Sequence, residues 1–246
     1  MLKKTAKISA VFRKMINSVD FKIRHKIKKS DFTRKVKLTF KIMMGMIIKK
    51  SSKSSQNALN DMRLNGVVDY TVTNSAYTQA RAKLNYTAFV ELREKSTEMF
   101  YEDGEYNKYK GFRLLAVDGM ITTLPHTEDV NKEFNPMSVK CQIKDFEKKV
   151  IQARVSVLYD LMNNIALDAS INNKVNSNDN DLVTYDERTL ALQHLEYCNK
   201  DDLVLFDRGY PSYELFVKYA KVTNFLVRIP KSSFARSRFL FAPHCN

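Results

Sequence analysis

The sequence has 246 residues, of which 44% are hydrophobic, and its formal net charge is +14. This length suits one large domain, or one medium domain with a smaller appendage, and the apolar content is too high for a disordered chain. The longest strongly apolar run, IMMGMII at 42–48, is far too short to span a bilayer, and the N-terminus has no apolar signal core. The three cysteines form no CxxC pair, so neither a zinc site nor a disulfide framework is supported, and we expect a cytoplasmic protein.

The positive charge is concentrated in the N-terminal fifth of the chain. Residues 1–53 carry 17 Lys and Arg against two acids, whereas the remaining residues have a net charge of −1. A basic segment of this strength usually binds a polyanion, most often nucleic acid, although a solvated tail would carry the same charge. Part of the segment is expected to fold, because apolar residues recur there at helical spacing: Ile8, Val11, Phe12, Met15 and Ile16.

Residues 1–105 are predicted to form a basic helical DNA-binding region. We expect helices over residues 3–16 and 34–48, around Leu59 and Met62, and in two segments after Gly66 that meet at Asn85. Thr73 or Asn74 is the expected N-cap of the first of these two segments. Residues 51–100 are typical of a helix-turn-helix unit, but this indication is weak because any small helical bundle has the same pattern.

Residues 106–246 have the pattern of an α/β domain. Five strands are expected in the order β-β-β-α-β-α-β, within FRLLAVDGM, VIQARVSVLYDL, NIALDASINN, DLVLFDRGY and NFLVRIP. Three strands in hairpin sequence, followed by strands linked through helices, favour a mixed five-stranded sheet with flanking helices.

Two acids in this domain occupy matching positions. Asp118 and Asp207 each follow an apolar strand and come shortly before a glycine, so we expect them at adjacent strand tips. Two neighbouring carboxylates repel each other unless a cation lies between them, and such hard oxygen ligands suit Mg²⁺ or Mn²⁺. Metal ions held in this way support phosphoryl transfer. A simple turn is an equally good interpretation, because Asp-Gly is a common turn pair.

The residues around both acids resemble a known family. LLAVDGMITTLP and LVLFDRGYPSYELF are similar to the first two acid-bearing motifs of DDE transposases of bacterial insertion sequences, in the group named after insertion sequence four. Flanking blocks, among them SSQNALNDM and DERTLALQHLE, extend the resemblance over roughly residues 30–234. The resemblance implies a ribonuclease-H-like catalytic core. It also implies metal-dependent cleavage and transfer of double-stranded DNA at transposon terminal repeats, with Asp118 and Asp207 as the first two catalytic and metal-binding acids.

The sequence departs from this family at the third acid, a Glu within a Tyr-Arg-Glu-Lys type signature that is absent here. We therefore expect a transposase truncated before that acid and inactive by itself; the alternative is a non-catalytic DNA-binding remnant or a regulator of transposition. Glu187 could substitute for the missing acid, but it is explained more simply as negative charge at a helix start. Glu214 lies too close to Asp207 in sequence to be an independent ligand. Dimer formation and pairing with full-length transposase are both left open, and no membrane partner is expected.

Candidate DNA contacts lie in both parts of the chain. We expect phosphate contacts from Lys26, Lys28, Lys29, Arg34, Lys35 and Lys37, and contacts to bases or backbone from Gln79, Arg81 and Lys83. A solvated helix face is an equal alternative for Arg81 and Lys83. Arg208 and Arg228 are candidates to grip phosphates near the metals, with a structural ion pair as the alternative for Arg208. Tyr210 is expected either to stack on a base or to pack under the next helix.

Overall fold

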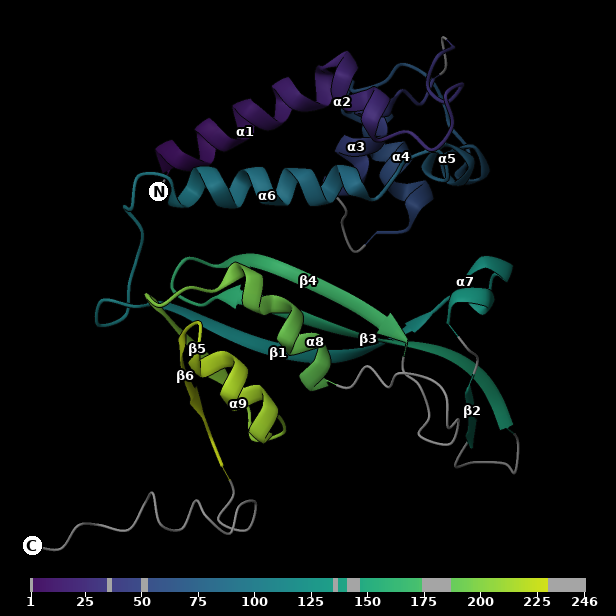
Figure 1. The fold of residues 1–246 in the computed structure, drawn as a ribbon. Helices are drawn as coiled ribbons and strands as arrows, with labels where there is room; N and C mark the ends of the chain where they lie inside the picture. The colour runs from purple at the N-terminus through teal and green to yellow at the C-terminus, as the bar shows by residue number, and fades with distance from the viewer. Residues whose placement is uncertain are drawn as a thin grey trace, which may run out of the picture. The chain divides into compact units, whose positions relative to one another are not determined.

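The computed structural model describes residues 2–34, 37–49, 53–134, 137–140, 147–173 and 187–229. The chain divides into two compact units, Met1–Gly104 and Glu105–Asn246 (Figure 1). Within the described ranges, no helix combines the length and the apolar character needed to cross a bilayer.

The described part of the first unit is mainly helical. Its helices are α1 (Leu2–Asn17), α2 (Val19–Arg24), α3 (Phe40–Ile48), α4 (Ser55–Leu64), α5 (Asn74–Arg81) and α6 (Thr87–Tyr101). Hydroxyl N-caps accept a backbone N–H from the first turns of α2 to α5, which stabilises each helix start. The helix expected over residues 34–48 is shorter than predicted, because it begins only at Phe40, where Thr39 is the N-cap.

The first unit contains two small hydrophobic clusters. One joins α2, α3 and α6 through Phe21, Phe40, Met44, Ala88 and Leu92. The other joins α3, α4 and α5 through Leu38, Met43, Leu59, Val72 and Ala80. The helix α1 lies along α6 (Figure 1). Because α3 contributes to both clusters, it connects the two halves of the unit.

The second unit contains a mixed sheet, as expected. Its strands are β1 (Arg113–Leu124), β2 (Met137–Lys140), β3 (Glu147–Asp160), β4 (Ile165–Asn173), β5 (Asp202–Phe206) and β6 (Asn224–Val227). The five predicted strands lie in the order β4-β3-β1-β5-β6, and the unpredicted β2 pairs with the first residues of β3. The pairs β1–β3 and β3–β4 are antiparallel, whereas β1–β5 and β5–β6 are parallel. The unit is therefore an α/β domain.

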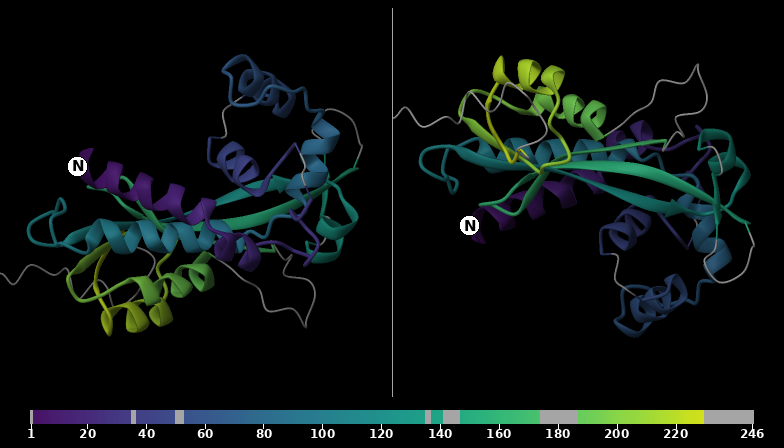
Figure 2. Two further views of the ribbon diagram at one scale, coloured as in Figure 1. Left: turned by 90° about the horizontal axis from the view of Figure 1, so that it is seen from above. Right: turned by 90° about the horizontal axis from the view of Figure 1, so that it is seen from below.

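Helices cover one face of this sheet. They are α8 (Glu187–Gln193), the 3₁₀ helix η1 (His194–Tyr197) and α9 (Tyr213–Ala220), while α7 (Glu128–Glu133) follows β1. Figure 2 shows α8 and α9 on the same side of the sheet. Alternate residues of β1 and β5, such as Val117 and Phe206, are buried against Ala191, Leu215 and Tyr219 of these helices. The period of two expected of a strand with one buried face is thus present in both strands.

The strand β1 is longer than the sequence predicts. It continues past Asp118 and Gly119 to Leu124, and it stays paired with β3 along this whole extension. The expectation that Asp118 ends its strand is therefore wrong, and so is the alternative that Asp118 and Gly119 only start a turn. An antiparallel partner satisfies the backbone of β1 beyond the point where the parallel partner β5 stops.

Candidate functional site

The two candidate catalytic acids are neighbours in the sheet. The last paired residues of the parallel strands β1 and β5 are Val117 and Phe206, and the next residue on each strand is Asp118 or Asp207. Neighbouring strands lie about 4.8 Å apart, so these two residues come close together although 89 positions separate them in sequence. Both side chains are exposed. Only Asp207 follows the end of its strand, whereas Asp118 lies inside β1.

Backbone hydrogen bonds order the segment around each acid. The N–H of Gly119 donates to Oδ1 of Asp118 at 2.9 Å. The N–H of Tyr210 donates to the carbonyl of Asp207 at 3.1 Å, which closes a turn directly after β5. This turn carries the chain back over the sheet, and Ser212 then caps α9.

The side chain of Glu187 packs against Gly119, on the sheet face that α8 covers, whereas the alternation along β1 directs Asp118 to the opposite face. A methyl group added to Gly119 would lie 3.2 Å from Glu187 Cγ and 3.2 Å from the Tyr210 hydroxyl, so both side chains press against the backbone next to Asp118. Glu187 begins α8, as expected of a residue that complements the helix dipole. Its Oε1 also lies 3.0 Å from Arg154 Nη1 on β3, an ion pair that the sequence did not reveal.

Tyr210 is buried next to Gly119 and Glu187. Its side chain is 2% exposed and its ring packs against Phe206, which excludes the stacking on a base considered above and confirms the packing alternative. Its hydroxyl has no hydrogen-bond partner within the described part of the chain. Burial raises the pKa of this hydroxyl well above its usual range, and the negative charges of Glu187, Asp118 and Asp207 raise it further. The group therefore stays protonated.

The donor set around Asp118 and Asp207 fits one hard divalent cation. Two adjacent, exposed carboxylates provide oxygen ligands, and Mg²⁺ commonly keeps several waters beside one or two carboxylates. Among the described residues, however, no three His, Cys, Asp or Glu side chains are arranged so that they could hold a metal ion together. Glu214 is directed elsewhere, because it pairs with Lys218 at 2.6 Å.

The two arginines predicted near the acids are both exposed. Arg208 follows Asp207 directly, and Arg228 follows β6. Within the residues that the structure describes, Arg208 makes no ion pair, so both the phosphate contact and the structural pair with a core acid stay predictions. An exposed guanidinium next to Asp207 stays available for an anionic ligand.

Several predicted DNA-binding residues come together in the first unit. A depression of about 570 Å³ is lined by Arg34, Lys37, Gln79 and Lys83, together with hydroxyl residues that include Ser30, Thr33, Thr71 and Thr73. Lys28, Lys29 and Arg81 are exposed outside this lining, Lys26 is half-buried, and Lys35 lies outside the described residues. Segments far apart in sequence therefore form one polar, basic surface.

The helices α4 and α5 differ from a compact helix-turn-helix. The connection between them covers residues 65–73, whereas the turn of that motif usually has three or four residues. Lys83 lies beyond the end of α5 and not on the helix where it was expected. Its carbonyl accepts a hydrogen bond from the N–H of Ile27 at 3.0 Å, which connects this turn to the basic segment after α2.

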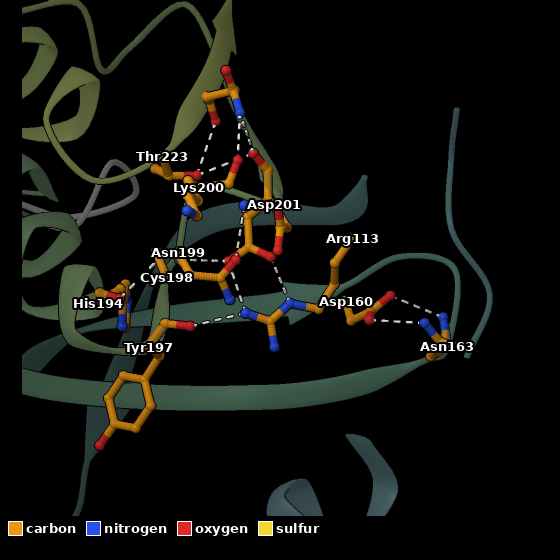
Figure 3. Close-up of polar contacts among 12 residues, drawn as sticks. Arg113, Asp160, Asn163, His194, Tyr197, Cys198, Asn199, Lys200, Asp201 and Thr223 are labelled. Carbon is orange, nitrogen blue, oxygen red and sulfur yellow. Dashed lines mark hydrogen bonds and ion pairs between the residues drawn. The ribbon is translucent and has the colours of Figure 1, made fainter. Parts of the chain in front are cut away.

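Sequence reasoning missed two buried polar networks. In the first, Arg113 makes a two-pronged ion pair with Asp202 and donates to the carbonyl of Tyr197 at 3.0 Å (Figure 3). In the second, His194 Nδ1 lies 2.8 Å from Asp168 and its Nε2 lies 3.0 Å from Ser156 Oγ. The residues of each network come from different strands and helices, so no local sequence motif predicts these contacts.

The Ser156–His194–Asp168 network has the order of contacts of a hydrolase triad. Ser156 and His194 are both 0% exposed, however, and His194 belongs to η1, which packs against the sheet. A substrate cannot reach a hydroxyl in this position, so the network is structural.

Comparison with known proteins adds no functional assignment to this geometry. No family model matches the chain, and no significant match is found among curated proteins.

Proposed function

We propose that the chain is a transposase-type protein that binds the ends of a mobile DNA element and acts on DNA strands with a divalent metal. The observation that supports this proposal best is the adjacency of Asp118 and Asp207 on the parallel strands β1 and β5. The strand order β4-β3-β1-β5-β6 is compatible with a ribonuclease-H-like core, the fold that the resemblance implies.

In this proposal Asp118 and Asp207 hold Mg²⁺ or Mn²⁺ between them. A metal ion bound there would make a water or hydroxyl a stronger nucleophile and would stabilise the leaving oxygen of a phosphodiester. The carboxylates supply charge and orientation, because their strands form a rigid support for both side chains. Arg208 binds a phosphate of the substrate strand next to the acids, and Arg228 extends this positive surface beyond β6.

The first unit provides the DNA-binding surface in this proposal. Arg34, Lys37 and Lys83 neutralise phosphates around the polar depression, while Gln79 and the surrounding hydroxyls donate hydrogen bonds to backbone oxygens or base edges. The supporting observation is that these residues, predicted separately from sequence, line one surface.

A second candidate function is favoured by one specific observation. The described residues provide no three-carboxylate group for metal binding. Residues that act as a catalytic unit lose most of their rate when one member is absent. A chain with only two metal-binding acids would bind transposon ends without cutting them and would thereby regulate transposition.

Cleavage of DNA that carries the terminal repeats, with Mg²⁺ or Mn²⁺ present, distinguishes the two candidates. A catalytic transposase should nick the repeats at specific positions, and both Asp118→Asn and Asp207→Asn should abolish nicking. Glu214→Gln is the matched control, since this exposed acid pairs only with Lys218 in the described structure, and nicking should persist in it. Specific retention of the DNA without nicking identifies the regulator, and absence of both binding and nicking refutes the proposal.

A further inference from the structure

A groove between α3 and α4 in the first unit has an apolar lining. Its volume is about 500 Å³, and both helices and the segment after α4 contribute to it. The apolar lining residues are Ile42, Met46, Ala58, Met62 and Val67. None of them is fully buried, so the α3–α4 groove presents apolar surface to solvent. A sugar-phosphate backbone does not cover such a surface, and an occupant of the groove must therefore be largely apolar.

Gly45 keeps the α3–α4 groove open. It lies inside α3, where a glycine is less favourable for the helix than an alanine. Its backbone does not have the positive φ that favours glycine, and a methyl group added there would meet nothing within 4 Å. The described structure of the chain thus gives no reason for a glycine at this position. The space that it leaves lies in the groove and is available to a side chain of a partner.

The rim of the groove is basic. Lys41, Lys49 and Lys53 lie along it, against one acid, Asp61. Lys53 pairs with Asp61 at 2.6 Å, whereas Lys41 and Lys49 are exposed and make no ion pair within the described ranges. A second copy of this chain placed face to face on the groove would bring like charges together. Charge complementarity therefore favours an acidic partner.

The length of the groove indicates the form of this partner. The lining residues run from Lys41 to Lys49 on the α3 side and from Ala58 to Asn65 on the α4 side, which corresponds to about 10–12 Å along each helix. An amphipathic helix places apolar residues at i, i+4 and i+7 on one face over this length. Acidic residues beside that face would lie close to the lysines of the rim.

We propose that the α3–α4 groove binds an acidic, amphipathic helix of a partner protein, whose apolar side chains fill the space at Gly45 and whose carboxylates pair with Lys41 and Lys49. The groove shares no lining residue with the polar depression assigned to DNA. Its occupation leaves that depression free, so this inference does not depend on the proposed function.

The experiment measures the fluorescence anisotropy of a labelled peptide mixed with the full chain. The peptide is an amphipathic helix with Leu at i, i+4 and i+7 and Glu at the flanking positions. We expect saturable binding to the wild type. A peptide with Gln in place of each Glu should bind more weakly, because it cannot pair with Lys41 and Lys49.

Gly45→Leu tests the open space in the groove. The added side chain occupies the place of one apolar anchor, so affinity for the peptide should fall about tenfold to a hundredfold, the equivalent of one buried leucine. Leucine favours a helix more than glycine does, so thermal unfolding should show a folded variant at least as stable as the wild type. Asn60→Leu is the matched control, because it adds the same side chain to an exposed position of α4 outside the groove, and it should keep the wild-type affinity.

Charge reversal tests the rim. Lys41→Glu and Lys49→Glu should each weaken binding of the acidic peptide about twofold to fivefold, the range of an exposed ion pair. Lys14→Glu changes the net charge equally, but this exposed lysine of α1 does not line the groove, so the affinity should stay close to that of the wild type.

Three results would overturn the inference. They are equal peptide affinity in Gly45→Leu and the wild type, equal weakening in Lys14→Glu and Lys41→Glu, and a wild-type chain that binds dodecanoate but no peptide, since the groove then takes a small amphiphile and not a helix. DNA affinity is measured in parallel and should be the same in Gly45→Leu and the wild type. A wild-type chain that binds the peptide but no DNA refutes the proposed function and leaves this inference standing.

Discussion

At the scale of single residues, Arg113 and Asp202 show how one ion pair can fix the start of two parallel strands. They face each other in the register of β1 and β5, and both are buried. Two nitrogens of the guanidinium donate to the carboxylate at 2.8 and 2.7 Å, and the N–H of Asn199 donates to it at 2.8 Å (Figure 3). Both oxygens of the Asp202 carboxylate thus accept hydrogen bonds, from Arg113 on β1 and from Asn199 in the loop before β5.

Removing Arg113 should therefore be costly. Arg113→Met leaves the Asp202 carboxylate buried without its counter-charge, and we expect the free energy of unfolding to fall by about 3–5 kcal/mol. Urea denaturation followed by circular dichroism measures the change. Lys218→Met, which breaks only the exposed pair with Glu214, is the control and should cost about 0–1 kcal/mol. Similar losses in the two variants would contradict the assignment.

Glu91 connects the stability of the first unit to pH. Its carboxylate lies 2.6 Å from His25 Nε2 and 2.6 Å from Arg24 Nη2. Partial burial alone would raise the pKa of Glu91, but the hydrogen bonds from His25 and Arg24 outweigh it and lower this pKa from its ordinary value. A pKa that is lower in the folded state means that the stabilisation is complete above the unfolded-state value, about 4.3.

Stability should consequently decrease as the pH falls from that value through the lowered pKa of Glu91. Glu91→Gln cannot ionise, so we expect this variant to lose less stability than the wild type between pH 6 and pH 3. The measurement is the free energy of unfolding as a function of pH. Glu98→Gln is the control, because this exposed acid pairs only with Lys95 in the described structure and its substitution should leave the pH dependence close to that of the wild type.

At the scale of elements, helix starts follow local chemistry, whereas strand ends depend on partners. Hydroxyl caps explain where α3, α4, α5 and α9 begin. In contrast, β1 continues beyond Asp118 because β3 still pairs with it there, and β5 stops where the chain turns at Asp207. The Asp-Gly pair, a turn signal in isolation, is overridden by this pairing.

The cap of α9 offers a direct test of the local contribution. Ser212 Oγ accepts the N–H of Leu215 at 3.1 Å, so Ser212→Ala removes the partner of one helix-start donor and should cost about 1 kcal/mol of stability. Ser212→Asp restores an acceptor near the positive helix end and should recover most of the loss. Chemical denaturation of both variants measures these changes, and equal stability of the two would contradict a capping role.

At the scale of the whole molecule, charge is segregated along the chain. Residues 1–53 carry all of the excess positive charge, and the depression of the first unit gathers part of it on one surface. Binding of a polyanion to such a surface releases counterions, so affinity should fall steeply as salt rises.

The slope of this salt dependence should show how many phosphate contacts the depression makes. Replacing Arg34, Lys37 and Lys83 together by Ala should reduce the slope of log affinity against log salt by about 0.9 for each lost phosphate contact. The control removes the same charge from exposed lysines of the second unit, Lys132, Lys200 and Lys221. The measurement is fluorescence anisotropy of labelled duplex DNA bound to the full chain. An equal reduction in both triple variants would show that net charge, and not this depression, determines binding.

Local patterns in the sequence predicted much of this protein. Apolar period, turn residues and hydroxyl caps indicated most helices and five of the strands, because each depends on interactions within a few residues. They also indicated an α/β sheet with helices, and placed Asp118 and Asp207 after apolar runs that turned out to be neighbouring parallel strands. The short strand β2 was missed, because its four residues are too few to show a clear apolar period; it pairs with the nearby first residues of β3.

Tertiary structure alone decided the surroundings of these acids. The contacts of Glu187 with Arg154 and Gly119, the burial of the Tyr210 hydroxyl, and the pair of Arg113 with Asp202 all join elements that are far apart in sequence. The apolar period of the sequence does not predict such contacts. The Arg113–Asp202 pair depends on the register between β1 and β5, and the contacts of Glu187 depend on where α8 packs on the sheet. The sequence by itself therefore determined which residues carry the candidate chemistry, and packing decided which other side chains lie beside them.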